Sequence, residues 1–186
     1  MKTQFDVDSF LEKGKIQNEL DFERALIADR KLRVMAKENP KLKAVRKKLR
    51  DLIEAYENKT WSPEAKITED KLKESDWAEQ TAEKERVFIH NRKKLIKTKL
   101  KELDLSQQDF GVILGHTSKS YMSELMNGVS PFSLKDLVVI SQLLKIELTD
   151  LVPTFLPQKE RIKIKTSIKK LDNPKLSLSE DDFALA

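Results

Sequence analysis

Seven of the polar side chains between residues 107 and 127 are placed by type and spacing to contact phosphates and base edges. Lys119 is suited to a phosphate or to guanine, Ser120 to either, and Glu124 to the exocyclic amine of cytosine. Gln107 and Asn127 are suited to phosphates, each from the end of an expected helix. The full set of predicted DNA-binding residues is Gln107, Ser118, Lys119, Ser120, Tyr121, Glu124 and Asn127.

For two of these residues, a structural role fits the residue type and position as well as a DNA contact does. Tyr121 suits stacking on DNA, but an aromatic at this position also suits the edge of a core or a dimer contact. Glu124 suits a base contact or an ordinary surface ion pair with Lys119 or Lys97.

The composition opposes catalytic and metal chemistry. The 186 residues include no cysteine and only two histidines, His90 and His116. Disulfides, thiol catalysis and Cys-ligated metals are thereby excluded, and a Ser-His-Asp triad or a His-rich metal site is nearly so. We therefore expect no catalytic residue, no metal, no cofactor and no enzymatic activity.

The overall charge is compatible with an acidic partner but does not demonstrate one. The chain has 36 Lys and Arg against 31 Asp and Glu, a formal net charge of +5. No apolar run approaches the roughly 18 residues of a membrane helix, and the N-terminus lacks the apolar core of a signal peptide. We expect a protein that has no membrane contact and lies in the cytoplasm.

The predicted contact residues belong to a helix-turn-helix pattern. Ser106 is a plausible N-cap for a helix over 107–114 with Phe110, Ile113 and Leu114 inward, and Gly111 in its middle favours close approach by a second helix. After a tight turn, a second helix is expected over 119–127 with Met122 and Leu125 inward, and it would be the recognition helix.

A third helix is expected over 134–144, and Ile146, Leu148, Leu151 and Val152 are expected to close the core. Before the pattern lies a run of cations, from Arg92 to Lys101, without an acidic residue. This run suits a phosphate backbone. It equally suits a solvated helix face around inward apolar residues, which are Leu95, Ile96, Leu100 and Leu103.

Outside this pattern, we predict an all-α protein in four parts. Residues 1–60 form an N-terminal helical hairpin broken at Asn39-Pro40, residues 61–86 a polar, partly helical linker, and residues 87–156 a five-helix domain. Residues 157–186 form an irregular or strand-forming tail, because the segment 161–168 alternates apolar and polar residues and 177–186 is acidic. The tail suits a strand added to a partner, a basic arm on DNA, or a segment that stays disordered until bound.

Residues 105–151 resemble the Cro/CI-type (XRE) helix-turn-helix family, and within it the HigA antitoxins. The segments LSQQDFGVILG, SKSYMSELMNG and PFSLKDL carry the resemblance. Residues 20–59 are also similar to the helical N-terminal hairpin of one HigA subgroup, with its break near ENP and its ending at Tyr56-Glu57. The resemblance implies a lambda-repressor-like domain that binds operator DNA as a homodimer. It also implies that the N-terminal part, the linker or the tail binds a HigB-like toxin that cleaves mRNA.

The predicted function is therefore that of a type II antitoxin that neutralises this toxin and represses its own operon. The alternative is a stand-alone Cro/CI-type repressor with no toxin partner.

Overall fold

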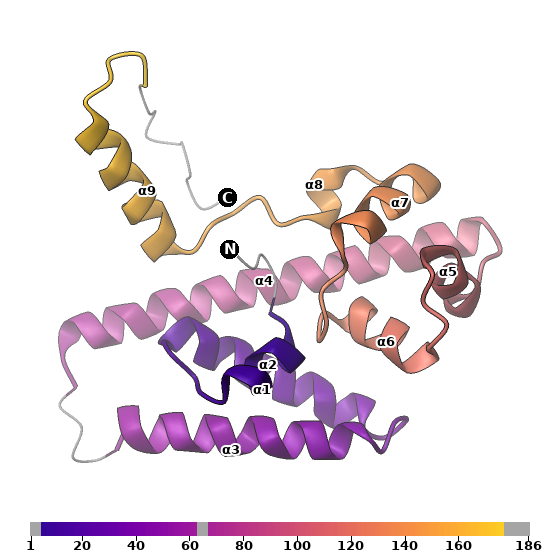
Figure 1. The fold of residues 1–186 in the computed structure, drawn as a ribbon, viewed down its shortest axis with the longest axis horizontal. Coiled ribbons are helices and arrows are strands. Elements are labelled where there is room, and N and C mark those ends of the chain that lie inside the picture. Colours follow the sequence, from indigo (N-terminus) through magenta and orange to yellow (C-terminus); the bar gives the residue numbers. More distant parts are fainter. Residues whose placement is uncertain (1–4, 63–66, 177–186) are drawn as a thin grey trace. The chain divides into compact units, whose positions relative to one another are not determined.

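The computed structural model describes residues 5–62 and 67–176, and every regular element among them is an α-helix. The chain forms two compact units, residues 1–152 and residues 153–186. The all-α fold class is confirmed (Figure 1). No helix in the described part of the chain is long and apolar enough to cross a membrane.

The first unit begins with α1 (Val7–Lys13) and the hairpin of α2 (Glu19–Met35) and α3 (Leu42–Thr60). Asn18 caps α2 by accepting a hydrogen bond from the Asp21 N–H, which satisfies a backbone donor that the first helical turn leaves open. The apolar face of the hairpin packs around Leu32 and Leu49, both fully buried. The predicted hairpin is therefore present.

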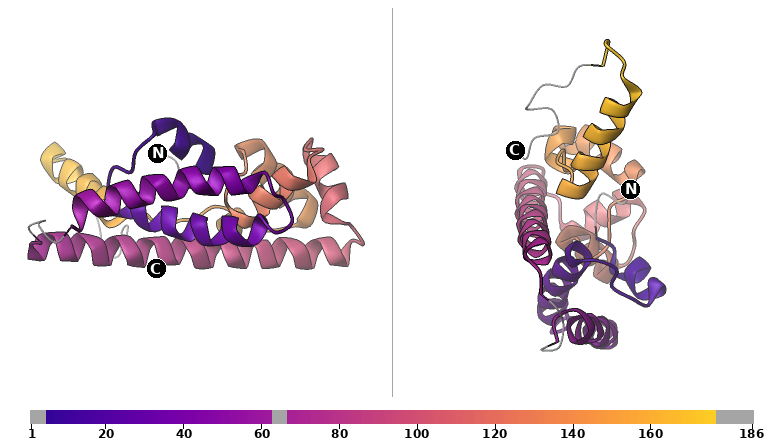
Figure 2. Two further views of the ribbon diagram at one scale, coloured as in Figure 1. Left: turned by 90° about the horizontal axis from the view of Figure 1, so that it is seen from below. Right: turned by 90° about the vertical axis from the view of Figure 1, so that its left-hand side faces the viewer.

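Helix α4 (Glu69–Glu102) is 34 residues long and runs alongside the hairpin before it enters the helix-turn-helix region (Figures 1 and 2). Thr68 caps its first turn. The helix continues without a break across the predicted boundary at residues 86 and 87. Most of the predicted polar linker, from Glu69 onward, is therefore part of α4. The four-part division of the chain itself stays a prediction.

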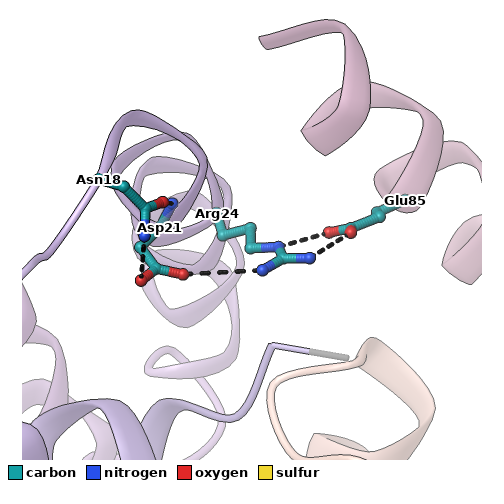
Figure 3. Close-up of polar contacts among 4 residues, drawn as sticks. All are labelled: Asn18, Asp21, Arg24 and Glu85. Atoms are coloured by element: carbon teal, nitrogen blue, oxygen red, sulfur yellow. Dashed lines mark hydrogen bonds and ion pairs between the residues drawn. The ribbon is translucent and has the colours of Figure 1, made fainter. Parts of the chain in front are cut away.

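A forked ion pair fixes the hairpin on α4. The Nε and one terminal nitrogen of Arg24 in α2 lie 2.8 and 2.5 Å from the two carboxylate oxygens of Glu85 in α4 (Figure 3). Asp21 adds a second carboxylate 3.6 Å from the same guanidinium. Both Arg24 and Glu85 are largely shielded from water, so this contact is more than a surface pair.

The C-terminal half of α4 joins α5 (Gln107–Leu114), α6 (Lys119–Asn127), α7 (Leu134–Leu144) and α8 (Leu148–Leu151). These five helical segments enclose a second core, whose fully buried members include Ile96, Phe110, Leu114, Met122, Leu125 and Ile140.

Three residues predicted to face this core are exposed instead. Leu103 and Leu148 lie at helix ends, and Ile113 lies on the outer side of the short helix α5. Elsewhere in α5, Phe110, Gly111 and Leu114 supply the buried contacts.

The second unit corrects the prediction of an irregular or strand-forming tail. Its residues 158–171 form a helix, α9 (Gln158–Leu171). The alternating pattern is misleading because Ile164, Ile168 and Leu171 also recur at helical spacing, and the intervening lysines are good helix formers. The acidic stretch 177–186 lies outside the described residues.

Candidate nucleic-acid interface

Local hydrogen bonds fix the start of both helices of the motif. Ser106 and Asp109 form a capping box at the start of α5, which places Gln107 in its first turn. Ser118 caps α6, and its Oγ accepts the Tyr121 N–H at 3.2 Å. Ser118 thus fixes the start of α6, which is a structural use of its hydroxyl oxygen.

The turn between α5 and α6 depends on two glycines. Gly115 has φ of +88°, a left-handed conformation that other residues adopt at a cost. At Gly111, a Cβ would lie 2.7 Å from both the His116 carbonyl oxygen and the Met122 Cγ. The predicted reason for this glycine, close approach of α6, is therefore confirmed.

Helix α6 buries Met122 and Leu125 as expected, and Lys119 lies exposed at its N-terminal end. Lys119 forms no salt bridge within the described residues. Gln107 and Lys119 line the same groove, so the structure brings these two predicted contacts together.

Ser120 is engaged by the hairpin. The Nδ2 of Asn39, in the turn between α2 and α3, donates to the Ser120 Oγ at 2.5 Å. The same hydroxyl lies 3.4 Å from Glu124 Oε1 and donates to it. A serine hydroxyl has one proton, so Ser120 can donate to a base only if it exchanges Glu124 for that base. Approach of a double helix also requires Asn39 to move away.

Glu124 is half-buried and turned toward other protein groups. Burial raises the pKa of its carboxyl and the Asp8 carboxylate of α1 raises it further, whereas hydrogen bonds from Ser120 and Ser130 oppose the shift. The carboxyl therefore has its hydrogen-bond donors inside the protein and is repelled by Asp8. A backbone hydrogen bond joins α1 to the segment after α6: the Val7 N–H donates to the Val129 carbonyl at 3.1 Å.

Asn127 and Tyr121 also have partners inside the protein. The Asn127 amide accepts from Lys93 Nζ of α4 at 2.6 Å and donates to the Ser123 carbonyl at 2.7 Å. The Tyr121 ring packs edge-to-face on His116, with ring centroids 5.2 Å apart, yet Tyr121 remains 39% exposed. His116 in turn lies 3.1 Å from the buried Asp136 carboxylate, so this histidine is structural.

The hairpin, α4 and α6 together enclose a groove of about 1030 Å³, here called the basic groove. Six cationic side chains line it: Arg30, Lys31, Arg86, Lys93, Lys97 and Lys119. Glu38 is the one acidic residue among its described lining. Sequence reasoning missed Asn39, Arg30 and Lys31 because they lie some 80 residues before α6. Only a prediction of how the hairpin docks would have found them.

Arg92 does not join this cationic surface, although it belongs to the basic run. Its side chain is buried, donates to the Leu151 carbonyl at 3.1 Å, and lies over the Phe132 ring at 5.2 Å. Burial lowers the pKa of Arg92 to about 10. The basic run suits either a phosphate contact or a purely structural role. Arg92 has a structural role, whereas Lys93 and Lys97 line the groove.

No group of three or more potential metal-ligating side chains occurs within the residues that the structure places.

Residues 96–151 match a family model described as helix-turn-helix. No curated protein and no solved structure matches the chain significantly. The matched residues cover the end of α4 and all of α5 to α8, which is the domain that presents Lys119 and Ser120. This protein therefore carries a Cro/CI-type helix-turn-helix domain, which makes it a sequence-specific DNA-binding regulator.

Proposed function

We propose that this regulator is the antitoxin of a type II toxin–antitoxin system. It binds and neutralises a HigB-like, mRNA-cleaving toxin and represses its own operon as a homodimer. The single observation that carries the DNA-binding half of the proposal is the helix-turn-helix domain at residues 96–151, where Lys119 at the start of α6 forms no salt bridge with a described residue.

The N-terminal hairpin supports the toxin-binding half. It is a folded element outside the matched domain, and it contacts α6 directly through Asn39 and Ser120. A partner that binds the hairpin would thereby act on the DNA-reading helix. The resemblance of residues 20–59 to the HigA hairpin points to the same partner.

A homodimer is proposed because one helix-turn-helix unit contacts few base pairs, and operators for such units mirror a two-fold axis. The two half-sites are then expected about 34 Å apart along the DNA.

Co-expression tests the toxin-binding half. The toxin candidate is the small basic product of a reading frame next to this gene. Expected results are co-purification of the two chains and restored growth in cells that express the toxin. If this protein neither binds that product nor restores growth, the antitoxin assignment fails, and the stand-alone repressor becomes the better account.

A further inference from the structure

The basic groove contains more positive charge than the surrounding protein neutralises. Elsewhere in the first unit, two partly buried arginines are each held by a carboxylate, Arg24 by Glu85 and Arg46 by Asp29. In the groove, Lys31, Lys97 and Lys119 form no salt bridge with any described residue. Like charges gathered in a concave surface raise the local concentration of anions. The groove therefore attracts a negatively charged ligand.

The state of Lys31 supports this conclusion. Burial and, to a smaller extent, the positive charges of Arg92, Arg86 and Lys93 lower its pKa to about 8, against a weaker opposite effect of Glu85. A bound anion would counter the effect of these cations and raise the pKa of Lys31.

The floor of the groove is apolar. Its buried lining residues are Met35, Leu42, Ile89, Met122 and Met126, whereas the lining residues Lys97 and Lys119 are exposed. Methionine side chains adapt to irregular shapes and make favourable contacts with aromatic rings. An apolar floor beneath a cationic rim suits a molecule that has phosphates at one end and a flat ring at the other.

The size of the groove suits a small ligand and not a double helix. A volume of about 1030 Å³ is at the upper end of ordinary ligand sites. A duplex whose major groove alone is about 12 Å wide does not fit into it. The hydrogen bond from Asn39 to Ser120 also joins the hairpin turn to α6 at the groove.

We propose that the basic groove binds a nucleoside phosphate. The rim cations, with Lys31, Lys97 and Lys119 foremost, hold its phosphates, and the methionine floor holds its ring. Because Lys119 and Ser120 line the groove, the bound ligand competes with DNA for α6; this second statement rests on the proposed DNA-binding function.

Calorimetry on the full chain in low-salt, magnesium-free buffer tests the site, with ATP, inorganic triphosphate and adenosine as probes. We expect one ATP per chain, weaker binding of triphosphate and no measurable binding of adenosine. The variant Lys31→Gln with Lys97→Gln should bind ATP at least about tenfold more weakly. It should melt no lower than the wild type, because neither lysine forms a salt bridge with a described residue and the charge of Lys31 is partly desolvated.

The matched control is Lys48→Gln with Lys94→Gln, which removes the same charge from exposed positions of α3 and α4 outside the groove. This control should bind ATP as the wild type does. The proposal is overturned if neither ATP nor triphosphate binds at millimolar concentration, or if the control loses as much affinity as the groove variant. Binding of duplex DNA alone would also overturn it.

A gel shift separates this proposal from the proposed function. If both hold, ATP releases the protein from its own upstream DNA. DNA binding without ATP binding contradicts the groove proposal alone. ATP binding that depends on Lys31 and Lys97, with no DNA shift at all, contradicts the DNA-binding function and leaves the groove proposal standing.

Discussion

At the residue scale, the seven predicted contacts serve different purposes. Lys119 is exposed and has no ion pair among the residues that the structure describes, whereas Ser118 caps α6, Asn127 binds Lys93, and Glu124 lies near Asp8 of α1. Residue type and spacing predict that α6 reads DNA. They did not show which of its side chains are already occupied, because their partners come from α1, α4 and the hairpin turn.

The first residue-scale prediction concerns the exposed N-terminal end of α6. Lys119→Ala with Ser120→Ala should weaken binding to the upstream DNA of the gene by at least about tenfold, because each base contact contributes roughly 1–3 kcal/mol. Folding should be retained, since neither side chain belongs to the core. Gel shifts at physiological salt provide the measurement, with Lys94→Ala as the exposed control. An unchanged shift contradicts the assignment of α6 as the recognition helix.

The second residue-scale prediction concerns pH. Because the pKa of Lys31 is lowered to about 8 in the folded protein, the unfolded chain binds this proton more tightly. Between about pH 8 and pH 10, stability should therefore rise with pH through Lys31. The variant Lys31→Met should lack this contribution and be more stable than the wild type near pH 7. Urea unfolding at pH 7 and pH 9.5 measures the stability of the wild type and of Lys31→Met. If the stability of both proteins depends on pH in the same way, the prediction is contradicted.

At the scale of elements, sequence reasoning identified the helices that caps and apolar spacing define. The Asn39-Pro40 break, the Ser106 cap and the glycines at 111 and 115 each correspond to a local feature of the structure. It was wrong for α9, where a short alternating pattern also fits a helix. The continuity of α4 was not predicted either, because its polar N-terminal half derives its stability from packing on α2.

The ion pair between α2 and α4 carries an element-scale prediction. Arg24→Met should lower the free energy of unfolding by about 1–3 kcal/mol, because it leaves the shielded Glu85 carboxylate without its partner. Arg86→Met, which breaks the exposed pair with Glu83, should change it by less than about 1 kcal/mol. Denaturant unfolding gives both values. Equal effects of the two substitutions would mean that the Arg24 pair does not anchor the hairpin.

The hairpin turn carries a second element-scale prediction. Asn39→Ala removes its hydrogen bond to Ser120, and a net value of about 0.5–1.5 kcal/mol for that bond corresponds to DNA binding up to about tenfold tighter. Asn91→Ala, at an exposed position of α4 outside the groove, should leave the affinity unchanged. Fluorescence anisotropy with upstream DNA measures both. Weaker binding by Asn39→Ala would show that the turn assists α6 instead of restraining it.

At the scale of the whole molecule, one long helix of the first unit joins the hairpin to the helix-turn-helix core. Helix α4 carries the hairpin on its N-terminal half and the helix-turn-helix core on its C-terminal half. The hairpin turn lies against the recognition helix, so any partner that moves the hairpin also changes access to Ser120. This arrangement gives the proposed antitoxin a physical route from toxin binding to repression.

The central claim is that this protein reads a specific DNA sequence, and one measurement tests it most directly. The affinity of the full chain is compared for its own upstream DNA and for an unrelated duplex of equal length, over 50 to 200 mM salt. Specific binding at least about 10³-fold tighter than non-specific binding at physiological salt is the predicted result, with both weakening as salt rises. Equal affinity for the two duplexes at every salt concentration would contradict the claim.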